Sequence, residues 1–220
     1  METDILVQRL VAEATPVRRR GSPARLVLTW LAIGLPFVVA TAIWHGFDRD
    51  LRALAADPRF LSEECAALAT AVAAALAAFA SGTPGFSRAY RYLPLPALAI
   101  WIAMIGAGCA ASLSRVGGSW FSLGIDTGCL PAMAASGIIP AAAMLLLVRG
   151  SVPLTPNLTT FYAALAPAAL VSFSLQLFHA GDLTPTALVW HFGLVWLVAP
   201  LLASLGRWIL VWPRPAWAGH

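Results

Sequence analysis

Residues 26–44 read LVLTWLAIGLPFVVATAIW, an apolar run that contains no charged side chain. A run of about 20 apolar residues is long enough to cross the hydrocarbon core of a bilayer as a helix. Pro36 lies inside the run, and membrane helices tolerate such a kink because neighbouring helices satisfy the carbonyl group that it frees. This segment predicts a membrane-spanning helix.

Five further apolar segments follow, and the six predicted spans cover residues 26–44, 65–81, 95–113, 130–148, 161–178 and 188–211. With 60% hydrophobic residues, 11% charged residues and a mean hydropathy of +0.79, the chain cannot bury its apolar surface in a soluble domain. We therefore predict an all-α, polytopic bundle of six transmembrane helices. The predicted parts are a cytosolic arm over residues 1–25, the membrane domain over 26–211 and a cytosolic tail over 212–220.

All 14 basic residues are arginines, and their distribution predicts the orientation of the spans. Ten arginines fall on the side of the two termini, namely Arg9, Arg18, Arg19, Arg20, Arg25, Arg88, Arg91, Arg149, Arg207 and Arg214. The other four are Arg49, Arg52, Arg59 and Arg115. Because cytoplasmic loops carry the excess of arginine, both termini should be cytoplasmic. The net charge of +4 then reflects topology, and we expect no direct contact with nucleic acid.

A cleavable signal peptide is an alternative reading of the first span. Basic residues precede the apolar run, and Ala40-Thr41-Ala42 near its end is a sequence that a signal peptidase could accept. The run is longer than the apolar region of a usual signal peptide, and the tail before it is long and patterned. We interpret the first span as retained.

The N-terminal tail carries the pattern of an amphipathic helix. Thr3 can cap it, and Thr15-Pro16 should end it. The apolar stripe consists of Leu6, Val7, Leu10, Val11 and Ala14, and the opposite side carries Asp4, Gln8, Arg9 and Glu13. A helix of about eleven residues is marginal alone in water, so we expect it to fold fully only when its stripe is covered.

Two covers fit this stripe. The first is the bilayer surface or the cytosolic ends of the spans, with Arg18 to Arg20 resting on anionic headgroups. The second is a groove on another protein, into which an amphipathic helix lays its apolar face. The residues alone favour the first cover, because an interfacial helix also carries a basic flank.

A series of short motifs and single residues occurs along the chain in this order: Met1-Glu2-Thr3-Asp4-Ile5-Leu6, Pro16-Val17-Arg18-Arg19, Asp57-Pro58-Arg59-Phe60, Pro84-Gly85, Arg88, Leu93-Pro94-Leu95, Cys129, His179 and Trp190. In this order and spacing the chain resembles, nearly end to end, the NrsF-like family. The members are six-span bacterial membrane anti-sigma factors that restrain an extracytoplasmic-function sigma factor.

The resemblance implies that the arm binds the sigma factor and keeps it from core RNA polymerase, while the outer face senses the signal for release. It also implies the bacterial inner membrane as location. The composition makes the lipid bilayer the second partner, and we predict no cofactor. The predicted partner-binding residues are Asp4, Leu6, Val7, Arg9, Leu10, Val11, Arg18 and Arg19, of which Leu6, Leu10 and Val11 would be the apolar anchors.

In such proteins sensing is associated with two cysteines, one matching Cys129 and one directly after the histidine that matches His179. This chain has Ala180 at the second position, so that disulfide cannot form here. Cys65 and Cys129 begin predicted spans at matching depth on the outer side, and one hypothesis is that they form or exchange a disulfide. The residues favour two unpaired thiols, because depth does not fix lateral distance.

Other chemistry-bearing side chains gather on the predicted outer face: His45, Asp48, Asp50, Glu63, Glu64, Asp126, Cys129, His179, Asp182 and His191. Their types suit zinc or copper, but no close ligand pair is present, and we predict no metal site. His191 lies about a turn inside the sixth span, where an ionisable group tends to face a cavity or a partner. The predicted signal-sensing set is therefore Cys129, His179, Cys65 and His191.

The segment between the first two spans predicts a short surface helix. Phe47, Leu51, Leu54 and Ala55 can share one face, and Asp57-Pro58 should end it.

Catalysis is poorly supported, because the chain has no nucleophile-elbow signature, no phosphate-binding glycine loop and no pair of carboxylates within the predicted spans. We predict that the protein is not an enzyme. A small six-span transporter or channel-like protein is the main alternative, although most predicted spans lack the ionisable groups that coupled transport needs near the midplane. A thiol or quinone redox protein would be expected to have a close cysteine pair, which this chain lacks.

Overall fold

The computed structural model describes residues 2–13, 21–46, 51–83, 85, 87–116, 129–149, 155–178, 193, 197, 199–206 and 210. These residues form helices and turns, and no strand occurs among them. The elements in chain order are α1 (Glu2–Glu13), α2 (Pro23–His45), α3 (Leu51–Ala56), α4 (Pro58–Ser81), η1 (Arg88–Tyr92), α5 (Pro94–Val116), α6 (Cys129–Arg149) and α7 (Pro156–Phe178). The predicted all-α class is therefore confirmed for this part of the chain.

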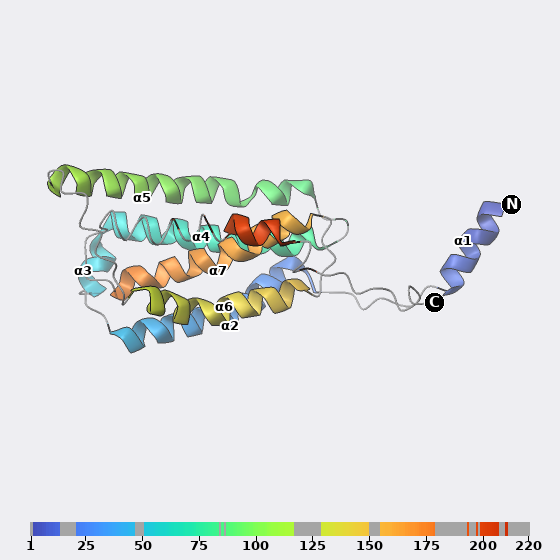
Figure 1. Cartoon of the computed structure of the whole chain (residues 1–220), viewed down its shortest axis with the longest axis horizontal. Coiled ribbons are helices and arrows are strands. Elements are labelled where there is room, and N and C mark those ends of the chain that lie inside the picture. The colour runs from blue at the N-terminus through green and yellow to red at the C-terminus, as the bar shows by residue number, and fades with distance from the viewer. Residues whose placement is uncertain are drawn as a thin grey trace.

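The long helices α2, α4, α5, α6 and α7 run side by side as one elongated bundle, and α1 lies apart from it (Figure 1). Helix α4 is central, because it packs against α2, α5 and α7, whereas α5 lies at one edge. Short α3 lies at one end of the bundle beside α4. The arrangement is an up-and-down bundle with an appended arm.

Three helices of the described residues are long and apolar enough to cross a membrane, namely Pro23–Trp44, Pro58–Ser81 and Arg88–Gly108. Residues 134–149 of α6 form a shorter apolar helix. The sixth predicted span lies largely outside the described residues, although residues 199–204 are helical. Six spans therefore remain a prediction, of which the structure supports three.

Helices α2 and α4 begin with the same arrangement, a polar cap followed by proline. The Arg25 N–H donates to Ser22 Oγ at 3.4 Å, and the Arg59 N–H donates to Asp57 Oδ1 at 2.9 Å. Proline suits the first helical position because its missing N–H would have no partner there. Asp57-Pro58 thus starts α4 as well as following α3, and the helix begins at Pro58 rather than at Cys65 as the apolar pattern predicted.

An alanine stripe lets α4 pack closely against its neighbours. Ala71, Ala74, Ala75 and Ala78 are fully buried. Small side chains allow helix backbones to approach, which is a common basis of helix packing in membranes. In the apolar window of α4, 61% of the residues are buried, against 28% for the windows of α2 and of the segment that contains η1 and α5. The two less buried helices expose the apolar surface that a bilayer would cover.

Helices α2 and α6 meet at Pro140, which lies inside α6. The buried Trp30 indole Nε1–H of α2 donates to the Pro140 carbonyl oxygen at 2.9 Å. One turn further along α2, a Cβ at Gly34 would lie 3.2 Å from Leu170 Cδ2 of α7 and 3.4 Å from Pro140 Cβ. Three helices therefore converge at Gly34, where there is no room for a side chain without displacement of a neighbour.

Candidate functional site

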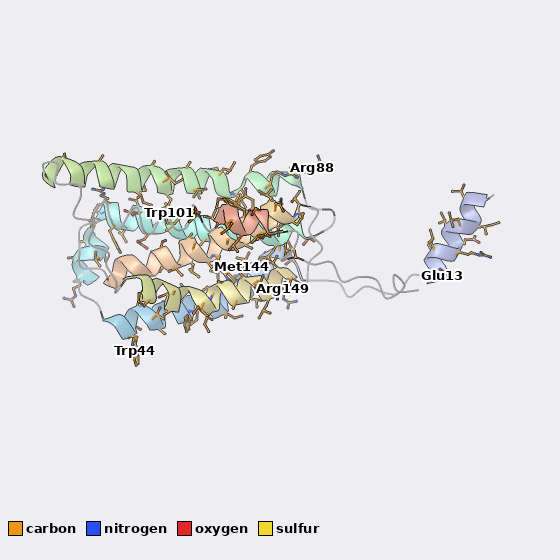
Figure 2. All side chains as sticks on the ribbon, viewed as in Figure 1. Glu13, Trp44, Arg88, Trp101, Met144 and Arg149 are labelled. Atoms are coloured by element: carbon orange, nitrogen blue, oxygen red, sulfur yellow. The ribbon has the colours of Figure 1, made fainter. Side chains whose placement is uncertain are left out.

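The arm α1 is an amphipathic helix whose apolar side chains are uncovered. Every described side chain of α1, from Thr3 to Glu13, is exposed, and Ile5, Leu6, Val7, Leu10 and Val11 are between 53% and 69% exposed. Figure 2 shows the side chains of α1 projecting from an isolated helix that ends at Glu13. The predicted stripe therefore exists as a helical surface without a cover.

The bounds of the arm differ slightly from the prediction. Thr3 was expected to precede the helix as its cap, but α1 already includes Glu2, so Thr3 lies inside the first turn. The described part of the helix runs to Glu13, and the expected end at Ala14 lies outside the described residues. Among the predicted partner-binding residues, Asp4, Leu6, Val7, Arg9, Leu10 and Val11 lie on α1, whereas Arg18 and Arg19 lie outside the described residues.

Charged residues lie at both ends of the bundle. Arg88 and Arg149 lie at one end of the bundle, and Trp44 lies at the other end, where it is 87% exposed (Figure 2). Helix α2, in which Arg25 is the third residue, starts at the same end as η1, whereas α3, which contains Arg52, lies at the end of Trp44. Charges at the two ends of an apolar bundle are what a membrane-spanning arrangement requires.

The basic end is held together by polar contacts between elements. The Tyr162 hydroxyl of α7 donates to the Arg91 carbonyl oxygen of η1, and the hydroxyls of Ser81 and Thr159 lie 2.6 Å apart between α4 and α7. At Gly206 an added Cβ would lie 2.7 Å from Thr160 Oγ1, so the last described segment packs directly on the start of α7. These contacts hold η1, α4, the start of α7 and the segment around Gly206 together at this end of the bundle.

At the opposite end lie two of the carboxylates that were considered as metal ligands. Glu63 and Glu64 are only 4% and 5% exposed, so both are buried in the bundle. Their positions could have been noticed from helical spacing, because Glu64 lies on the same side of α4 as Ala71, Ala75 and Ala78. Hydropathy missed them, since it counts a carboxylate as evidence against burial.

The predicted sensing residues are only partly described. Cys65 is an exposed free thiol. Cys129 opens α6, but its side chain is not described, and His179 and His191 lie outside the described residues. The proposed exchange between Cys65 and Cys129 stays a prediction.

The residues considered as metal ligands are also only partly described. Asp48, Asp50, Asp126 and Asp182 lie outside the described residues, and the His45 side chain is not described. Within the part of the chain that the structure covers, no group of three potential ligands comes together.

Taken together, these features define a helical bundle with a charged rim and an uncovered amphipathic arm, an architecture suited to holding a partner. Residues 10–212 match the model of the family NrsF, negative regulator of sigma F. The match covers most of the chain, and the protein belongs to this family. The match begins within α1 and runs through the bundle. No significant match was found among curated proteins or among solved structures.

Proposed function

We propose that this protein is a membrane-bound anti-sigma factor, which holds an extracytoplasmic-function sigma factor on its cytosolic arm. The observation that carries the proposal is the uncovered apolar stripe of α1 in a member of a family of negative regulators of a sigma factor. The bundle anchors the arm in the bacterial inner membrane, with both termini in the cytoplasm. The regulator acts by binding, without catalysis.

The stripe is large enough to serve as a binding surface. Full burial of one Leu or Val side chain contributes roughly 1.5–3 kcal/mol. The free energy gained by covering Leu6, Leu10 and Val11 would therefore match or exceed the free-energy cost of ordering a marginal segment, which is about 2–5 kcal/mol. We expect a groove on a protein partner to bind the arm more tightly than a lipid surface does. Such a groove can cover the three apolar anchors and also place charged groups opposite both Asp4 and Arg9.

Release is proposed to follow a signal on the outer side of the membrane. The exposed thiol of Cys65 supports a thiol-based step, which would have to use Cys129 as its partner because Ala180 replaces the second cysteine that the family resemblance implied. Such a disulfide would link the start of α6 to the second turn of α4.

The proposal is tested by purifying the tagged protein from its native host in mild detergent. We expect a sigma factor to co-purify in near-equal amount. The same purification after exposure of intact cells to a thiol oxidant, with wild type and with Cys65→Ser, tests the release step. Purification without any sigma factor would contradict the anti-sigma function, whereas equal release from both proteins would contradict only the role of Cys65.

A further inference from the structure

Glu64 on α4 carries a buried carboxyl group, and the proposed binding of a sigma factor gives this group no role. Its side chain is 5% exposed, and its Oε2 atom has no hydrogen-bond partner in the part of the chain that the structure describes. Buried polar atoms in folded proteins are almost always hydrogen-bonded. An exception of this kind calls for a physical explanation.

The position of Glu64 explains why it is buried. It lies in line with Ala71, Ala75 and Ala78, the stripe along which α4 packs most closely. Helix α4 packs against α2, α3, α5 and α7. Glu64 lies in its second turn, and its burial shows that the protein itself covers the carboxyl group.

An ionised carboxylate in such a position is strongly disfavoured. Removing an unpaired charge from water costs several kcal/mol, whereas a neutral carboxylic acid can be buried at much lower cost. Glu63, the preceding residue, is also buried, at 4% exposure, and its negative charge nearby disfavours ionisation of Glu64. Proton binding removes the cost without any movement of the backbone.

Several charged or titratable groups lie at this end. Those whose side chains the structure describes are Arg52 on α3, Asp57 as the cap of α4, and Arg59, Glu63 and Cys65 on α4. His45 at the end of α2, Arg115 near the end of α5 and Cys129 at the start of α6 also belong to this end, and their side chains are not described. Arg52 and Glu63 each have an interaction partner. Arg59 and Asp57 are exposed, so water screens their influence on the buried carboxyl group.

We propose that Glu64 is a proton-binding site at the outer end of the bundle. The ligand is a proton taken from water on that side of the membrane and bound at the carboxyl oxygen, which leaves a neutral acid between α4 and its neighbours. Loss of the proton places a bare charge in the closest packing of the bundle and loosens the outer end of α4. That the loosening influences the arm rests on the proposed function, whereas the proton site itself does not.

The test is infrared difference spectroscopy of the purified full-length protein in detergent at neutral pH, which detects the carbonyl stretch of a protonated carboxylic acid. We expect this band in the wild type, its persistence in Glu13→Gln, which alters an exposed carboxylate of the arm, and its loss in Glu64→Gln. The amide of glutamine copies the shape of the neutral acid, so the variant should fold. An unchanged band in Glu64→Gln would overturn the proposal.

A second variant and a second measurement keep the test decisive. If Glu64→Gln does not yield folded protein, Glu64→Asp should shift the band, and an unshifted band would overturn the proposal equally. The thermal unfolding midpoint of the wild type should fall as the pH rises and Glu64 loses its proton, and Glu64→Gln should lose this decline. Because no sigma factor takes part, failure here leaves the anti-sigma function untouched.

Discussion

At the scale of single residues, the bundle depends on positions where a helix has no room for a side chain. Gly34 of α2 faces both Leu170 and Pro140, and Trp30 one turn earlier donates to the carbonyl oxygen of the same proline. The proline inside α6 is thus contacted by two residues of α2 that lie one turn apart. Gly106 of α5 is the contrast, because a Cβ there would meet nothing within 4 Å.

We predict that Gly34→Val destabilises the protein and that Gly106→Val does not. Both changes add the same β-branched side chain to a helix, so the difference between them measures packing alone. Overpacking costs about 1–3 kcal/mol, whereas an open site should stay within roughly 0.5 kcal/mol of the wild type. Thermal unfolding in detergent measures both variants, and equal midpoints would show that α2 does not pack at Gly34 as described.

At the scale of elements, hydropathy located the helices but misjudged where they begin and what they bury. The apolar pattern placed the second span from Cys65, because the first two turns of α4 carry Arg59, Glu63 and Glu64. The Asp57 cap and Pro58 start the helix earlier, and tertiary packing then buries both glutamates. A hydropathy scale scores each residue by its type and its neighbours in sequence, whereas burial depends on which helices pack against it in the folded protein.

Other elements also differ in how well the local sequence predicts them. The expected short helix before the second span is present as α3, with Leu54 buried and Ala55 exposed, so its apolar face is narrower than predicted. The turn η1 was not predicted, since Arg88 to Tyr92 has no apolar periodicity and is instead fixed by Ser87 at its start and by the bond from Tyr162. The amphipathic arm was predictable because its pattern is local to the sequence.

We predict that α1 and α4 differ strongly in amide hydrogen exchange. A helix of 12 residues with every described side chain exposed has little free energy to oppose opening, whereas the alanine stripe of α4 is fully buried. Exchange of the purified protein, followed by mass spectrometry, should be complete in α1 at the shortest labelling time and slow across residues 71–78. Equal protection of the two helices would mean that the arm is already covered within the protein itself.

At the scale of the whole molecule, the protein consists of two parts, a bundle that we propose as the membrane anchor and an arm that is accessible to a partner. Arg88 and Arg149 lie at one end of the bundle, and the bundle presents apolar surface along its sides. A regulator built in this way can hold a partner at the membrane with one short helix. The family match includes the end of α1 and the bundle, and so unites both parts in one architecture.

The central claim, that the apolar stripe of the arm captures the sigma factor, is tested most directly by co-purification with a variant that destroys the stripe. Leu6→Asp/Leu10→Asp places two charges on the apolar face, and Gln8→Asp/Ala12→Asp places the same two charges, at the same spacing, on the opposite face. We expect the first variant to lose at least tenfold in sigma factor recovered per molecule, and the second to retain it, with equal membrane insertion of both. Undiminished recovery with Leu6→Asp/Leu10→Asp would contradict the claim.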